Sequence, residues 1–143
     1  MKVRLLNKSK NENPSYKTSG SSGMDIQASI KKGILLKPQE RVAVSTGLFL
    51  EIPENFEAQI RPRSGLALKR GITVLNTPGT IDSDYRGELL IILINHSGHN
   101  FKINNGDRIA QLVITKTERF SWETVNGLTE TKRGSGGFGS TGK

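Results

Sequence analysis

Two arginines and a serine stand close together in IRPRSGLALKRG, residues 60–71, at the start of a short stretch with helical character. Ser64 occupies the position expected for the N-cap of that helix. Guanidinium groups, a hydroxyl and the free amides of a helix start are all good donors to phosphate oxygens. Taken alone, the same residues also fit an ordinary capped helix with solvated arginines.

A second group of polar residues lies in GTIDSDYRGE, residues 79–88, which leads into the most apolar segment of the chain. One residue separates Asp82 from Asp84, and Tyr85 follows directly. A carboxylate beside a phosphate can orient a water molecule or hold a metal ion. By itself, however, DSDYRG is more typical of a polar turn.

Two single residues add to these groups. Asp25 follows the glycine of SGMDI, residues 22–26, at the entry to an expected strand. Gln111 stands among apolar residues in GDRIAQLVI, residues 106–114, where a buried amide needs a hydrogen-bond partner. Each of these signals is weak alone.

The glycine-rich segment RGSGGFGSTGK, residues 133–143, matches the spacing of two phosphate-binding motifs, the dinucleotide fingerprint and a P-loop without its last Ser or Thr. Both motifs require a turn between a strand and a helix. We expect no helix after Lys143, and the preceding GLTETK is not a buried strand. Both interpretations are therefore rejected.

The elements that must position these residues are mostly strands. FEAQI, residues 56–60, alternates apolar and polar side chains, and residues 33–38 and 40–52 are rich in β-forming residues. GELLIILIN, residues 87–95, is apolar on both faces, which predicts a central strand or a subunit contact. Asn105-Gly106 predicts a tight hairpin between two strands. An all-β sandwich or barrel is expected.

Outside this pattern lie a polar loop over residues 7–23 and the segment from residue 117 onward. Only residues 64–70 have helical character. Trp122, in the C-terminal segment, is expected to be a packing anchor rather than a ligand contact.

Composition narrows the classes of protein. With 143 residues the chain is expected to form one domain, and the absence of cysteine excludes disulfides, thiolate zinc sites and cysteine nucleophiles. His96 and His99 flank a turn and do not suggest a metal site. We find no signal-peptide pattern, and the longest apolar run, residues 89–94, is too short to cross a membrane. The expected protein is intracellular and soluble.

The formal net charge of +8 is compatible with nucleic-acid binding. However, the charges are scattered and few aromatic residues are present for base stacking. A small polyanion that is attracted into a cleft is therefore the favoured partner, and no specific nucleic acid is expected.

Taken in order, these segments resemble the five ordered motifs of the homotrimeric dUTPase family. SSGMDIQA resembles the first motif, RPRSGLALKRGI the second, GTIDSDYRGE the third, GDRIAQLVI the fourth and RGSGGFGSTG the fifth. The resemblance runs from about Met24 to the C-terminus. Ser22 and Ile26 replace the commoner Ala and Leu of the first motif, and Thr80 stands where an aliphatic residue is common.

The resemblance implies a jelly-roll-like β-sandwich or barrel with one short helix, assembled as a cytoplasmic homotrimer. Residues 1–132 would form the β domain and residues 133–143 a flexible lid. The family hydrolyses dUTP to dUMP and pyrophosphate with Mg²⁺, which limits uracil incorporation into DNA and supplies dUMP for thymidylate synthesis. Its active sites lie between subunits, and the tail of a third subunit closes each one.

By the same resemblance, Asp82 activates the water that attacks the α-phosphorus, and Asp25 holds the Mg²⁺ through water molecules. Tyr85 packs under the deoxyribose, where a 2′-hydroxyl would collide. The other substrate contacts form three sets. The triphosphate contacts are Arg63, Ser64, Gly65 and Gln111; the uracil contacts, on a hairpin of the third motif, are Asn76, Thr80, Ile81 and Leu90; the lid contacts are Arg133, Phe138, Gly139, Ser140 and Thr141.

The chemistry agrees with this assignment. Cleavage of a phosphoanhydride needs charge neutralisation, an in-line water and a base, and the sequence offers carboxylates, cations and amides without a nucleophile–histidine pair. Three alternatives stay open: a dCTP deaminase of the same fold, a non-catalytic nucleotide-binding regulator and a basic nucleic-acid binder. Asp82, Tyr85 and Phe138 together disfavour a silent relic.

Overall fold

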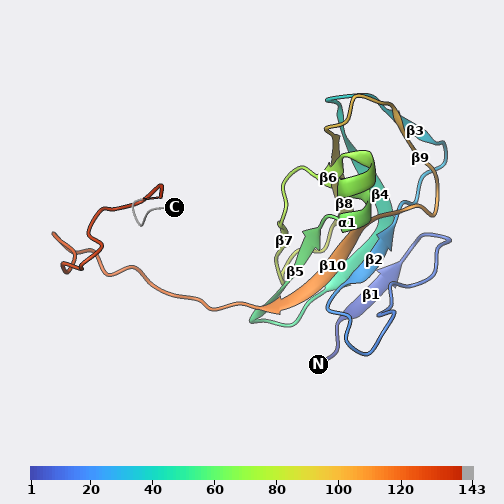
Figure 1. Ribbon diagram of the computed structural model, residues 1–143. Coiled ribbons are helices and arrows are strands. Elements are labelled where there is room, and N and C mark those ends of the chain that lie inside the picture. Colours follow the sequence, from blue (N-terminus) through green and yellow to red (C-terminus); the bar gives the residue numbers. More distant parts are fainter. Residues whose placement is uncertain (140–143) are drawn as a thin grey trace.

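Two four-stranded sheets form the body of the molecule in the computed structural model, which describes residues 1–139 (Figure 1). The first sheet has the order β1 (Arg4–Asn7), β4 (Arg41–Glu51), β8 (Glu88–Asn95) and β6 (Ile72–Val74). The second has the order β2 (Met24–Gln27), β10 (Arg108–Lys116), β5 (Phe56–Arg61) and β7 (Gly79–Ile81).

A two-stranded sheet of β3 (Ile34–Leu36) and β9 (Phe101–Ile103) and a single helix, α1 (Ser64–Arg70), complete the described elements. Every recorded strand pair is antiparallel. The expected all-β, jelly-roll-like fold with one short helix is therefore confirmed. Within residues 1–139, no helix has the length and apolar character needed to span a membrane.

Strand β8 shows how the sequence builds the core. Leu89, Ile91 and Leu93 alternate inward and are buried, each contributing roughly 1.5–3 kcal/mol to folding. The strand lies between β4 and β6, so the prediction of a central strand is confirmed. Its opposite face is less covered, since Leu90 is 49% exposed and Ile92 is only half-buried. One chain therefore leaves part of this apolar strand uncovered.

The turn at Asn105-Gly106 exists, but the predicted hairpin is wrong. β9 pairs with β3, whereas β10 pairs with β2 and β5, so the turn connects two different sheets. Gly106 adopts a φ of 82° and donates its amide to the carbonyl of Ala28 at 2.8 Å. The residues of a turn determine only its local geometry, whereas strand pairing depends on segments far away in the sequence. Here the two strands that flank the turn pair with other strands, so no hairpin forms.

The predicted N-cap of the helix is also wrong. Arg63 is the N-cap, with extended backbone angles, and Ser64 is the first helical residue without a capping hydrogen bond from its side chain. The carbonyl of Arg63 accepts the amide of Ala67 at 3.0 Å, which starts the helix one residue earlier. Gly71 ends the helix in the left-handed region, with a φ of 64°.

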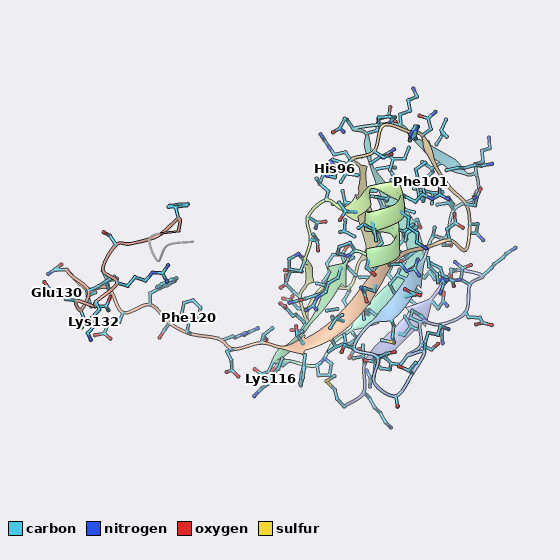
Figure 2. The ribbon with its side chains drawn as sticks, in the orientation of Figure 1. His96, Phe101, Lys116, Phe120, Glu130 and Lys132 are labelled. Atoms are coloured by element: carbon cyan, nitrogen blue, oxygen red, sulfur yellow. The ribbon has the colours of Figure 1, made fainter. Side chains whose placement is uncertain are left out.

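The chain leaves the body after β10. Residues 117–139, called here the C-terminal arm, contain no strand or helix and run away from the two sheets (Figure 1). Phe120, Glu130 and Lys132 project from the arm and not into the body (Figure 2). Trp122 is 86% exposed and contacts Phe120 edge-to-face, with 4.9 Å between ring centroids. Within one chain, the expected packing role of Trp122 is therefore wrong.

Candidate functional site

An ion-paired cluster forms around Asp25. Strand pairing places Asp25 of β2 beside Gln111 of β10, and Gln111 beside Arg61 of β5. The carboxylate of Asp25 accepts from Nε of Arg63 at 2.8 Å and from Nη1 of Arg108 at 3.2 Å. Asp25 and Arg63 are each largely buried, whereas Arg108 is about half exposed. Residues of three of the motifs therefore lie in one cluster of this chain.

Gln111 fixes the segment that leads into the helix. Its Nε2 donates to the carbonyl of Pro62 at 2.9 Å, which is the partner that a buried amide needs. A side chain on Gly23 would place its Cβ only 2.6 Å from Oε1 of Gln111. The glycine of the first motif is therefore required for Gln111 to lie where it does.

Ser64 and Gly65 begin α1 beside this cluster, and both are exposed. The first amides of a helix have no partner within the helix, so they can donate to an anion. A side chain at Gly65 would meet no atom of this chain within 4 Å. Steric contacts within the chain do not require glycine here, whereas close approach of a second molecule would.

Asp82 lies elsewhere, directly after β7. It is exposed and borders a hollow of about 310 Å³ at the start of β5, together with Asn55, Glu57, Asp84 and Arg119. The carbonyl of Asp82 accepts the amide of Tyr85 at 3.2 Å, so the two residues belong to one turn. A carboxylate at the mouth of a polar hollow can hold a water molecule and take its proton.

The two carboxylates are far apart within one chain. β2 and β7 are the opposite edges of the same sheet, and Asp82 is level with Glu57, whereas Asp25 is level with Arg61. Three strand spacings across the sheet and four residues along β5 separate them by about 20 Å. The predicted water-activating and metal-holding residues therefore do not meet in a single chain.

Tyr85 folds back over Gly87, two residues further along the chain. Its hydroxyl donates to the carbonyl of Glu88 at 3.2 Å, and a side chain on Gly87 would collide with the tyrosine ring. The ring is about half exposed, so one face remains available for a ligand.

Glu88, at the end of the third motif, has a lowered pKa. Partial burial opposes its charge, but hydrogen bonds from the Ser45 hydroxyl and from the amides of Gly47 and Thr46, together with the charge of Lys8, lower its pKa below the ordinary 4.5. The carboxylate is therefore held ionised against strand β4.

The expected uracil contacts come from both sheets. β7 pairs with β5 and β8 pairs with β4 and β6, so the hairpin predicted for the third motif is not a paired hairpin. The motif instead connects the short strand β7 of one sheet to the longer strand β8 of the other. Thr80 is exposed on β7, Ile81 is half-buried opposite Ala58, Leu90 is exposed opposite Ser45, and Asn76 Nδ2 lies 3.2 Å from the position of a Cβ on Gly79.

Of the tail residues, Arg133, Phe138 and Gly139 lie on the C-terminal arm, away from strands β2 and β7 of the same chain (Figure 1). Nε of Arg133 donates to the carbonyl of Gly136 at 2.9 Å, and Phe138 is fully exposed. Gly139 adopts a φ of 88°. Ser140 and Thr141 lie outside the described residues.

A metal ion would find few protein ligands. Residues 1–139 contain no group of three or more His, Asp or Glu side chains that could hold one. Both oxygens of Asp25 already accept from arginine, which disfavours direct coordination and leaves lone pairs for bound water. This donor set fits a Mg²⁺ that arrives with phosphate ligands and keeps several waters.

Sequence reasoning missed two residues of these clusters. Arg108 stands in the fourth motif, and its charge beside an expected strand was the signal that could have marked it. Glu88 closes the third motif, but nothing in the sequence links it to the residues near Ser45, which lie 43 positions away. Such contacts follow from strand register rather than from local pattern.

A family model described as dUTPase matches residues 9–142 of the chain. The deoxyuridine 5′-triphosphate nucleotidohydrolase of Cytophaga hutchinsonii is 55% identical, covering 99% of this chain and 92% of the relative. The enzyme of the same name from Treponema denticola is 58% identical and covers 90% of each chain.

Among solved structures, the Staphylococcus bacteriophage 80alpha dUTPase with dUPNHPP superposes with a TM-score of 0.89, at 25% identity and 99% coverage of both chains. A mutant dUTPase from phage phi11 of S. aureus, which coordinates a structural Mg(II) ion, has a TM-score of 0.81 at 23% identity and covers 91% of this chain and 100% of its own.

Proposed function

This chain belongs to the dUTPase family, and on that premise we propose how its residues hydrolyse dUTP to dUMP and pyrophosphate. The observation that carries the proposal is the separation of Asp25 and Asp82 by about 20 Å on opposite edges of one sheet. One triphosphate needs its attacking water and its cation within the span of its own phosphate chain. Each active site therefore takes Asp82 from one copy of the chain and Asp25 from the next.

The assembly that completes every site is a closed ring, and we place three copies in it. In a ring, the same two surfaces of each chain meet at every contact, so no half-site is left over. The half-covered outer face of β8 and the exposed aromatic residues of the C-terminal arm offer apolar surface for these contacts. The charge of +8 on each chain favours capture of the polyanionic substrate.

The Asp25 cluster is the phosphate half of the site. Arg63 donates to Asp25 and to the carbonyl of Arg108, which holds its guanidinium in place with some N–H groups left for phosphate oxygens. Ser64 and Gly65 add the free amides at the start of α1. Gln111 anchors Pro62 and so sets the position of this segment, besides its own expected phosphate contact.

The cation belongs to this half. A Mg²⁺ bound with the triphosphate supplies charge neutralisation at the phosphate oxygens. Asp25 would hold the waters of such an ion through the lone pairs that its two arginine partners leave free.

Asp82 is the catalytic base. Its carboxylate takes a proton from a water molecule as the water oxygen attacks the α-phosphorus, and pyrophosphate leaves from the opposite side. Its exposed position at the end of β7 lets it reach into the site of a neighbouring copy.

The remaining parts of the third motif read the nucleoside. Tyr85 lies under the deoxyribose and leaves no room for a 2′-hydroxyl. The hydrogen bond of its hydroxyl and its half-exposed ring support this role. The uracil contacts are Asn76, Thr80, Ile81 and Leu90.

The tail of a third copy closes the site as a lid. Phe138 is fully exposed and free to stack on the uracil ring, and Arg133 offers a guanidinium to the terminal phosphates. Gly139, Ser140 and Thr141 would add backbone and hydroxyl donors. Closure excludes water from the reacting phosphates.

Mixing two inactive variants tests the shared site. Asp82→Asn keeps the shape but removes the base, so turnover should fall by about 10²–10⁴ while dUTP still binds. Asp25→Asn damages the phosphate half. After the two variants are unfolded and refolded together, about one quarter of the sites in a random closed ring should combine an intact Asp82 with an intact Asp25.

Recovery of dUTP hydrolysis in the mixture, but not in either variant refolded alone, is the expected result. Equal activity of the mixture and of its parts would contradict a site shared between copies. Light scattering on the same samples measures the number of copies, and a fully active monomer would overturn the ring.

Substrate choice separates the alternatives. With dUTP, dCTP, dTTP and UTP in turn, pyrophosphate should be released from dUTP alone. Release of a uracil nucleotide from dCTP would instead support a deaminase of the same fold, and binding without turnover would support a regulator.

A further inference from the structure

Strand β4 contains a bulge directly opposite the end of the third motif. Ser45 pairs with Leu90 and Phe49 pairs with Glu88, so β4 advances four residues while β8 advances two. A bulge leaves backbone groups without partners in the ladder. The amide of Gly47 instead donates to Oε1 of Glu88 at 2.7 Å.

The carboxylate of Glu88 satisfies the free donors of this bulge. The same Oε1 also accepts from the amide of Thr46 at 3.1 Å and from the hydroxyl of Ser45. Gly47 adopts a φ of 69°, and a side chain there would bring its Cβ to 2.8 Å from the backbone nitrogen of Ser9. The bulge is thus fixed from one side by Glu88 and from the other by the N-terminal loop.

The main chain of the same residue holds the tyrosine. The carbonyl of Glu88 accepts the hydroxyl of Tyr85 at 3.2 Å, and Gly87 leaves the space in which the ring lies. The side chain and the carbonyl of Glu88 therefore connect the β4 bulge to Tyr85 through one residue.

We propose that Glu88 is a positioning residue for sugar discrimination. Its side chain anchors the β4 bulge, and its carbonyl thereby keeps the Tyr85 ring in the position that admits deoxyribose and excludes ribose. The inference rests on the role proposed above for Tyr85. We assign Glu88 no contact with the substrate, because Oε1 is occupied by three donors of β4. Hydrogen bonds to an ionised acceptor are about twice as strong as neutral ones, so the anchor is firm.

Three variants test this role through the ratio of kcat/KM for dUTP to that for UTP. Glu88→Ala removes the acceptor from three donors, and the ratio should fall by about three- to tenfold, as expected when a fixed neutral hydrogen bond becomes loose. Glu88→Gln keeps Oε1 and should restore most of the ratio. Glu51→Ala is the matched control, since Glu51 lies on β4, the strand that contains the bulge, and pairs only with Arg4 at the surface, at 3.1 Å. Its ratio should equal that of the unaltered protein.

A second measurement follows the tyrosine itself. The chain has two tyrosines, Tyr16 and Tyr85, so labelling with 3-fluorotyrosine gives two ¹⁹F signals, which Tyr85→Phe assigns. Glu88→Ala should shift or broaden the Tyr85 signal, whereas Glu51→Ala should leave it in place. This readout needs no turnover.

The outcomes distinguish the proposed role of Glu88 from the proposed role of Tyr85. If Tyr85→Ala leaves the dUTP-to-UTP ratio unchanged, the proposed role of Tyr85 is wrong, whatever Glu88 does. If Tyr85→Ala lowers the ratio but Glu88→Ala changes neither the ratio nor the ¹⁹F signal, the role of Glu88 is overturned.

Should Glu88→Ala fail to fold, Ser45→Ala replaces it, because it removes one donor to the same oxygen. A smaller change of both readouts in the same direction supports the proposal, and no change overturns it.

Discussion

The body of strands and the C-terminal arm differ in how they place their apolar side chains. In the body, buried apolar side chains alternate along the strands, and every buried side-chain nitrogen or oxygen within the described residues has a hydrogen-bond partner. In the arm, Trp122 and Leu128 are almost fully exposed, although large apolar residues favour burial. The body is complete as a fold, whereas the arm lacks a core of its own. The exposed side chains of the arm agree with the proposal that it binds to another copy of the chain.

This contrast predicts that the end of the arm matters for turnover and not for the stability of the body. Deleting residues 133–143 removes a guanidinium donor and a stacking ring from the proposed lid, so dUTP hydrolysis should fall by about 10²–10⁴. The melting temperature should stay the same. Steady-state kinetics and a thermal melt on one preparation measure both, and full activity of the truncated protein would refute the lid.

The converse change lies in the core of the body. Ile91→Ala removes a fully buried side chain from β8 and should lower the free energy of unfolding by about 2–5 kcal/mol. Leu68→Ala, on the exposed side of α1, is the matched control and should stay within about 0.5 kcal/mol of the original value. Urea unfolding measures both values. An equal loss of unfolding free energy in the two variants would show that the described packing is wrong.

Replacing Phe138 alone tests its proposed stacking on the base. Phe138→Ala should reduce kcat/KM for dUTP by about 10- to 100-fold, because stacking on a base is worth roughly 1–3 kcal/mol. Phe120→Ala, on the same arm but outside the proposed lid, serves as the comparison. If both variants lose the same activity, stacking by Phe138 is not the reason.

The smallest expected effect is a dependence of the stability of the body on pH. The folded pKa of Glu88 lies below its ordinary 4.5, so its charge stabilises the fold above pH 4.5, and this contribution is lost as the pH falls through the folded pKa. Glu88→Gln lacks this titration. The stability advantage of the unaltered protein over Glu88→Gln should therefore shrink below pH 4.5, as measured by urea unfolding between pH 3 and pH 7. A constant difference over that range would contradict the anchoring charge.

Local pattern predicted the elements and most of the clusters, and long-range pairing explains what it missed. The continuous apolar run over residues 87–95 predicted strand β8, and the segment around Asp25 was correctly predicted to enter a strand. The ion pair between Asp25 and Arg108 joins residues 83 positions apart, and no sequence spacing reveals it. The same holds for the failed hairpin at Asn105-Gly106, whose turn is local but whose strands pair elsewhere.

The placement of Asp25 and Asp82 on opposite edges of one sheet has a consequence for inheritance. If each copy lends its base to one site, its phosphate cluster to another and its lid to a third, a copy damaged in all three parts silences every site of a ring of three. An allele with such damage, expressed beside an intact one, would then act dominantly and remove more activity than its own share of the chains. Two alleles damaged at different edges would instead complement each other, because the ring brings the intact edge of one product to the intact edge of the other.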